Sequence, residues 1–450
     1  MSELKPVRLA GIATNVSWTS FEQILRVGLS FLVTVQVINY LGPERFGVYS
    51  YVISVIGILL PLTAFGLEQV VISRLVDCPG DADPLLGTTL VIRLVASVLG
   101  YGLALLIVFA LDRADGQRLP LTAIAAGMLL LQGADTVAFF FKAIMGARYI
   151  ALSRLAGLLA ASQGTIAQLL ADAALWTFLS MRVVEAAVTG VALLVAYRLW
   201  GGRISHWRFD GRECRRLLKA GFPLCIASFA IMVYMRVDQL MLGQMSSEAE
   251  LGYYGIAVRL AEVLNFVPMA VGTAFYPSLV DSRAQGPAVF HARIQAFFNL
   301  MALIGYGAAV SAAVAAPLGF HILFGHRYDQ ALPIFKLLVF NMPCICLGVA
   351  SGIMLTVSGR FWTSATATLA GVVVNVGLNL VLIPRYGAVG AACATLLSYW
   401  TVAHGIFLVV PGHRGTFGMI ARALVWPDVR PLLKTRKTRP ASGQASPDDK

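Results

Sequence analysis

Charged side chains are scarce in this chain of 450 residues. Asp, Glu, Lys and Arg make up 13% of it, about half of the ~25% found in soluble domains, whereas 58% of the residues are hydrophobic. A soluble core cannot hide that much apolar surface, because even a ~300-residue domain buries only ~75% of its surface. The composition, with a mean hydropathy of +0.75, excludes a water-soluble protein and indicates lipid as the solvent.

The sequence signatures of catalysis are missing or isolated. No glycine-rich loop followed by Lys-Ser/Thr occurs, which excludes ATP hydrolysis within the chain. The histidines have no zinc-ligand spacing, and the cysteines fall where small packing residues are expected. Asp81 and Asp83 match the D-x-D pattern of glycosyltransferases, but their short loop has no room for a nucleotide-binding domain. We therefore expect a protein that is not an enzyme, with no catalytic residue, metal or cofactor.

Long apolar stretches account for most of the chain. A membrane-spanning helix needs about 20 mostly apolar residues. Twelve such stretches can be placed, at residues 15–39, 45–67, 86–111, 120–142, 150–171, 174–199, 219–243, 252–279, 292–321, 331–357, 361–383 and 387–410. The predicted fold class is an all-α membrane protein of about 12 transmembrane helices. Residues 1–13 lack the features of a cleavable signal peptide, so we expect the first span to direct insertion.

Lysine and arginine are unevenly distributed among the loops. With the N-terminus inside, the cytoplasmic segments carry 24 of the 35 Lys and Arg residues. The outer segments carry only five, namely Arg45, Arg113, Arg118, Arg327 and Arg385. Because such an excess marks the cytoplasmic side, we predict a multi-pass protein of the bacterial cytoplasmic (inner) membrane with both termini cytoplasmic. The net charge of +12 then follows from topology, and we expect no nucleic-acid partner.

The loops between spans are short except for the basic segment 201–219. This predicted cytoplasmic linker separates an N-terminal lobe, residues 1–200, from a C-terminal lobe, residues 220–410, with six helices each, as in transporters built from parallel repeats. Residues 46–50 (FGVYS) resemble residues 251–255 (LGYYG), and a proline follows each. This similarity supports an internal repeat.

The end of the chain, residues 411–450, differs from the spans. Phe417, Ile420, Ala421, Leu424 and Val425 recur at helical spacing beside basic residues, which predicts a cytoplasmic amphipathic helix at the inner membrane surface. The polar, basic sequence after it predicts a disordered tail.

Twelve ionisable side chains fall inside the predicted spans or, for Glu68, directly after one. The bases are Arg26, Arg93, Arg182, Arg236, Arg259 and Lys336, and the acids are Glu22, Glu68, Asp135, Glu185, Asp238 and Glu262. Such residues usually face the protein interior or a water-filled cavity, because a charge in lipid is costly. Since the two signs balance, their numbers alone do not predict a positive path.

Spacing along a helix predicts partners for some of these charges. Three pairs can meet on one helix face and neutralise themselves: Glu22–Arg26, Arg182–Glu185 and Arg259–Glu262. By contrast, Arg93, Arg236 and Lys336 have no acid at such a spacing. Either another helix supplies an acid to them, or they line a polar path for an anionic group. Arginine suits the second task, because its planar fork binds phosphate oxygens bidentately.

Several segments carry a family resemblance. They are residues 41–50 (LGPERFGVYS), 236–239 (RVDQ), 252–254 (GYY), 259–262 (RLAE), 275–277 (FYP), 323–328 (LFGHRY) and 383–392 (IPRYGAVGAA). In this order the segments resemble the Wzx-type polysaccharide flippases. These are the oligosaccharide branch of the superfamily that also contains the MATE drug exporters and the lipid II flippase MurJ.

The resemblance implies a MATE-like fold of two six-helix bundles and a polyprenyl-diphosphate-linked oligosaccharide as substrate. It also implies a substrate path lined by charged residues, which transfers to Arg26, Arg236, Asp238 and Arg259 because they stand within the matching part of the chain, from about residue 15 to 410. Arg93 and Lys336 are added to the predicted path from the charge argument alone. MurJ-like members have two further spans, which argues against that subgroup.

The expected function is therefore flipping of a lipid-linked repeat unit by alternating access, for O-antigen, capsule or exopolysaccharide synthesis. Expected partners are the substrate, membrane lipids and the polysaccharide polymerase or export machinery. One alternative is a MATE-type cation or drug antiporter, in which Asp135, Glu68 or Asp238 would bind the substrate or the coupling ion. A membrane-embedded glycan polymerase or ligase is the other, but such enzymes usually carry a larger outer loop than this sequence has.

Overall fold

The computed structural model describes residues 9–112, 116–409 and 414–428. Most of these residues are helical, and none of them lies in a strand. The helices are α1 (Leu9–Ala64), α2 (Leu67–Asp77), α3 (Ala82–Leu111), α4 (Arg118–Leu130), α5 (Thr136–Ala143), α6 (Ala147–Leu170), α7 (Leu175–Leu199), α8 (Gly211–Met245), α9 (Glu248–Leu264), α10 (Phe266–Ala284), α11 (Pro287–Phe324), α12 (Ala331–Val339), α13 (Met342–Val357), α14 (Phe361–Trp400), α15 (Ile406–Val409) and α16 (Arg414–Val425).

The number of spans agrees with the sequence. Among the described residues, ten helical segments are long and apolar enough to cross a membrane. Two of them contain a glycine with non-helical backbone angles, Gly42 (φ 74°) in α1 and Gly387 (φ 54°) in α14, and each glycine divides its segment into two spans. Glycine suits these turns because it adopts positive φ without a steric cost. The prediction of an all-α protein with about 12 transmembrane helices is confirmed.

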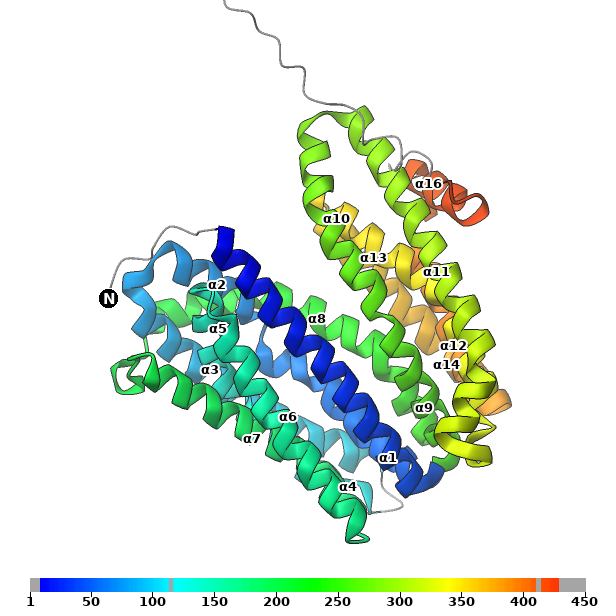
Figure 1. Cartoon of the computed structure of the whole chain (residues 1–450), viewed down its shortest axis with the longest axis horizontal. Helices are drawn as coiled ribbons and strands as arrows, with labels where there is room; N and C mark the ends of the chain where they lie inside the picture. Colours follow the sequence, from blue (N-terminus) through cyan, green and yellow to red (C-terminus); the bar gives the residue numbers. More distant parts are fainter. Residues whose placement is uncertain (1–8, 113–115, 410–413, 429–450) are drawn as a thin grey trace, which may run out of the picture. The chain divides into compact units, whose positions relative to one another are not determined.

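The helices pack into two compact units, each with its own core. The first unit extends to Val263 and also contains Ala315–Leu338 and Thr368–Ser398. Within it α1 packs against α6 and α8, and α6 packs along α7 (Figure 1). Side chains such as Leu86 and Phe141 are fully buried in its core. The division into two six-helix lobes at residues 201–219 stays a prediction.

The second unit contains Leu264–Val314, Val339–Ala367 and the described residues from Tyr399 onward. Phe297, Phe298 and Met301 of α11 and Leu347 of α13 form the centre of its core. The amphipathic helix predicted near the C-terminus is present as α16. Ile420, one of the residues predicted to contact lipid, is completely buried in this core, so part of that face packs on protein instead. The predicted disordered tail lies outside the described residues.

The repeated sequence segments meet in the first unit. A Cβ atom added to Gly47 of α1 would lie 2.9 Å from the carbonyl carbon of Glu248, and one added to Gly252 of α9 would lie 2.7 Å from the carbonyl carbon of Pro43. Gly47 and Gly252 are 205 positions apart, and so are Pro43 and Glu248. The contact is therefore reciprocal: equivalent glycines of the repeat each admit the other helix's backbone. We call this contact the glycine crossing.

Candidate functional site

Four arginines and three glutamates gather in the first unit, on α1, α7, α8 and α9. On α1, Arg26 binds Glu22 at 2.6 Å and also reaches Glu185 of α7 at 3.3 Å. The other carboxylate oxygen of Glu185 forms an ion pair with Arg182 at 3.3 Å. Two of the three local pairs predicted from spacing, Glu22–Arg26 and Arg182–Glu185, are thus confirmed. Glu185 joins them into one network across two helices.

The prediction that Arg259 pairs with Glu262 is wrong. Glu262 binds Arg236 of α8, with N–O distances of 2.9 and 3.2 Å. Of the two alternatives for Arg236, the structure therefore supplies an acid from another helix. Helical spacing could not reveal this partner, because it depends on how α8 packs beside α9.

Arg259 completes the arginine cluster, which we define by its seven charged members: Arg26, Arg182, Arg236, Arg259, Glu22, Glu185 and Glu262. Arg259 lies within electrostatic range of Arg182, Arg236 and Glu262, but it forms no ion pair with any described residue. The cluster holds one more positive than negative charge. Buried charges in a membrane protein are normally neutralised, so the half-buried Arg259 stands out as the charge of this cluster that no described residue pairs with.

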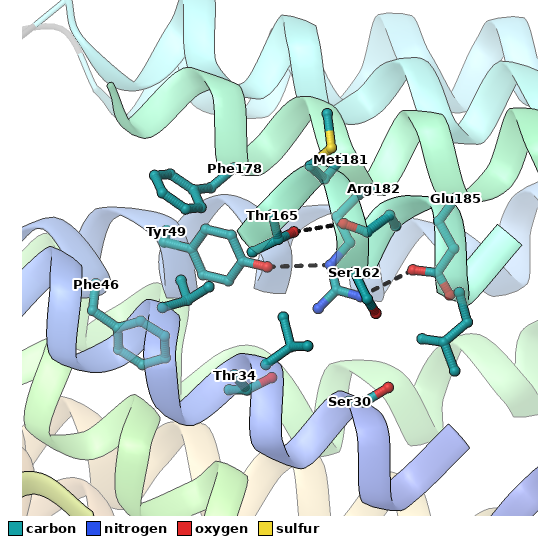
Figure 2. A pocket seen from close by; sticks show the side chains of 14 residues that line it. Ser30, Thr34, Phe46, Tyr49, Ser162, Thr165, Phe178, Met181, Arg182 and Glu185 are labelled. Atoms are coloured by element: carbon teal, nitrogen blue, oxygen red, sulfur yellow. Dashed lines mark hydrogen bonds and ion pairs between the residues drawn. The ribbon is translucent and has the colours of Figure 1, made fainter. Parts of the chain in front are cut away.

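Beside the cluster a small polar hollow lies between α1, α6 and α7 (Figure 2). Arg182 points toward Tyr49, and its Nε donates a hydrogen bond to the Tyr49 hydroxyl at 3.1 Å. Hydroxyl groups continue the wall; they belong to Ser30, Thr34, Ser162 and Thr165. The hollow has a volume of about 50 Å³, which is room for a few waters, because one water needs about 10–15 Å³ on this measure.

Arg93, also predicted for the path, lies away from the arginine cluster. It is 2% exposed on α3, where it contacts Asp135 at 3.5 Å and Gln132 at 3.2 Å. Its guanidinium also lies 5.0 Å from the ring centre of Phe139, within cation–π range. Both polar partners belong to the short 3₁₀ segment Leu131–Asp135 between α4 and α5, so here too another helical segment supplies the acid.

The two remaining predicted residues also lie outside the arginine cluster. Asp238 of α8 is buried and accepts hydrogen bonds from the Tyr254 hydroxyl, the Thr395 hydroxyl at 3.3 Å and the Gln239 amide at 2.7 Å. Lys336 on α12 is half-buried and makes no ion pair within the described part of the chain. Of the six predicted residues, the structure therefore brings together Arg26, Arg236 and Arg259. The role of all six in a substrate path stays a prediction.

Sequence reasoning missed two members of this polar system. Arg182 was assigned only to a local pair, yet it also binds Tyr49 and lies near Arg259. Tyr49 stands within the resembling segment 41–50, and that was the only sequence signal for it. Among the described residues, no three His, Cys, Asp or Glu side chains lie close enough together to hold a metal ion.

The fold and the buried charges define a multi-pass membrane protein. A solved multidrug resistance MATE family transporter of the MOP superfamily, in its inward-facing conformation, matches with a TM-score of 0.73. It has 15% sequence identity over 88% of this chain and 96% of its own. The lipid II flippase MurJ matches with a TM-score of 0.69 and 13% identity over 92% of each chain. At such identities these likenesses show the fold alone.

The family is shown by sequence. Residues 12–282 match the family model described as polysaccharide biosynthesis protein, and the chain belongs to this family. The uncharacterized membrane protein YabM of Bacillus subtilis is 25% identical over 42% of this chain. A probable low-salt glycan biosynthesis flippase of Haloferax volcanii is 24% identical over 50% of it. These matches span 37% and 48% of the two relatives' lengths. The family resemblance predicted from the sequence is confirmed at the level of this polysaccharide biosynthesis family.

Proposed function

We propose that the protein flips a polyprenyl-diphosphate-linked oligosaccharide across the bacterial cytoplasmic membrane for surface polysaccharide synthesis. The arginine cluster is the observation that carries this proposal, because it offers a cation without a counter-ion among helices that span lipid. A diphosphate head group is a strong anion that cannot cross hydrocarbon unaided, and arginine binds its oxygens through a planar fork. Family membership and the named glycan flippase relative support the substrate class.

Flipping requires no bond to be made or broken, so in this proposal the protein is a transporter and not an enzyme. A polar site that opens to each side in turn carries the head group, while the polyprenyl tail remains in lipid. Both termini are placed in the cytoplasm, as the distribution of Lys and Arg predicts. Partners from the polymerase or export machinery remain part of the proposal.

Arg259 gives the sharpest test of the cluster. Loss of a charge-assisted hydrogen bond costs ~1.5–3 kcal/mol, so we expect Arg259→Gln to reduce flipping by about 10- to 100-fold. Arg259→Lys should recover part of it, because lysine keeps the charge and loses the fork. Membrane abundance should not fall in either variant. Neutralising Arg259 removes its repulsion with Arg182 and Arg236 and breaks no ion pair.

The assay is complementation of a gene deletion, with lipid-linked repeat units on the inner leaflet, surface polysaccharide and protein abundance measured together. Arg45→Gln is the matched control, because Arg45 on α1 lies outside the cluster, is exposed and makes no ion pair with a described residue. Full activity of Arg259→Gln would refute anion binding by the cluster. Unchanged polysaccharide in the deletion strain, together with sensitivity to cationic drugs, would favour the MATE-type antiporter instead.

A further inference from the structure

A second polar cavity lies in the first unit, at a break between two helices. The helix α1 ends at Ala64, and Phe65 (φ 51°) and Gly66 (φ 62°) take left-handed conformations before α2 begins at Leu67. The 3₁₀ segment Leu131–Asp135 interrupts the wall between α4 and α5. The cavity has a volume of about 500 Å³. Irregular backbone at membrane depth is tolerated where it is buried in protein or lines a water-filled cavity.

The ionisable side chains that line this cavity include one more base than acids. Lys142 of α5 is paired with Glu68 of α2, and Arg93 of α3 is paired with Asp135 at 3.5 Å. Arg154 of α6 also lines the cavity, is half-buried, and makes no ion pair with any residue that the structure describes. Three bases therefore face two carboxylates, and the cavity attracts an anion.

The start of α2 adds to this attraction. Residues 66–69, the first turn of this 11-residue helix, line the cavity, and the capping residue Gly66 offers no side-chain hydrogen bond. A helix N-terminus presents unsatisfied amide groups and a partial positive charge. Independently, Arg93 is 98% buried in the cavity wall, and its Nε and Nη1 atoms lack a hydrogen-bond partner among the described residues. Buried donors without a partner are costly.

We propose that this cavity is a second anion site, which binds a phosphate or diphosphate group through Arg154, with Lys142, Arg93 and the α2 N-terminus around it. Its volume falls within the ~300–1,000 Å³ typical of small-molecule sites, ten times the hollow beside Tyr49. Apolar side chains form the rest of the wall, among them Leu60, Ala64 and Leu224. The wall thus fits a phosphate that carries an apolar chain as well as a free one. The site is separate from the arginine cluster and does not depend on flipping.

The experiment measures binding of two phosphate probes to the full chain in nanodiscs of phosphatidylcholine, a lipid with no net charge. The probes are inorganic pyrophosphate and geranyl diphosphate, which share the diphosphate and differ in the apolar chain. Arg154→Gln should weaken binding of both by about tenfold or more, because one charge-assisted contact is lost. The matched control is Arg148→Gln on the same helix, whose exposed side chain stacks on Tyr149 outside the cavity and should change affinity less than twofold.

The outcomes separate the possible sources of the anion and the two sites. Tighter binding of geranyl diphosphate would assign the cavity to a lipid-borne phosphate, and equal binding would assign it to free phosphate. The proposal is overturned if neither probe binds, if Arg154→Gln binds like the unmodified protein, or if Arg148→Gln loses as much affinity. It is also overturned if Arg259→Gln alone abolishes binding, because the anion would then occupy the arginine cluster only. That last result would leave the proposed function standing.

Discussion

The glycine crossing gives a prediction whose sign can be worked from the structure. A methyl group on Gly47 would lie 2.9 Å from the carbonyl carbon of Glu248, and one on Gly252 would lie 2.7 Å from that of Pro43. Carbon atoms in contact prefer about 3.5–4.0 Å. The atoms in the way belong to the backbone, so no side chain can rotate to make room. Each alanine must push α1 and α9 apart by more than about half an ångström.

The expected cost follows from two opposing terms. Alanine in place of a helical glycine stabilises a helix by about 0.5–1 kcal/mol, whereas overpacking a close contact costs about 1–3 kcal/mol. Gly47→Ala and Gly252→Ala should therefore each lower the midpoint of thermal unfolding in detergent. The control is Gly28→Ala on α1, where nothing lies within 4 Å of the added methyl group, and it should raise the midpoint slightly.

The reciprocal geometry adds a stricter requirement. Once one alanine has separated the two helices, the second meets less resistance, so the effect of the double variant should be smaller than the sum of the single effects. Contacting residues typically show coupling of 0.5–3 kcal/mol. If Gly47→Ala behaved like Gly28→Ala, or if the two effects were strictly additive, the close approach of the two backbones would be refuted.

Three further predictions concern charges and topology. Arg236→Ala should lower thermal stability by ~1–3 kcal/mol, because it leaves Glu262 without its ion pair. Changing both Arg236 and Glu262 to Gln should restore stability, but it should not restore flipping if Arg236 also contacts substrate. Full flipping by this double variant would exclude that contact. Arg118→Gln should destabilise the protein by about 3 kcal/mol in the same assay, since this buried guanidinium has two carboxylate partners and a carbonyl partner. An unchanged midpoint of unfolding would show that these contacts contribute nothing to stability. Reporter fusions after Arg212 and near Lys434 should behave as cytoplasmic, and an outer signal from either would contradict the predicted topology.

The spans were predictable because hydropathy over about 20 residues is a local property. The two turns that divide α1 and α14 were also visible, since Gly42 and Gly387 lie within the segments 41–50 and 383–392 that carry the family resemblance. What the sequence did not contain was the packing side of α16. Its spacing identifies an apolar face, but lipid and a protein core accept the same side chains, and only the structure shows Ile420 buried in protein.

Ion pairs were predictable only where one helix supplies both partners. Glu22 and Arg26 meet as their spacing predicts. Glu262 has Arg259 at the favourable spacing on its own helix, yet it binds Arg236 of α8. The energetic difference between such partners is small, since a pair on one helix contributes only ~0.2–0.5 kcal/mol. The packing of two helices therefore decides the choice.

That choice determines which arginine remains available. If Glu262 had paired with Arg259, then Arg236 would be the cation without a counter-ion. Because Glu262 binds Arg236 of α8, the cation without a counter-ion is instead Arg259. Arg259 lies within electrostatic range of Arg182 and Tyr49. The family resemblance included both arginines and could not rank them. The ranking comes from the packing of α8 beside α9, which brings Arg236 to Glu262.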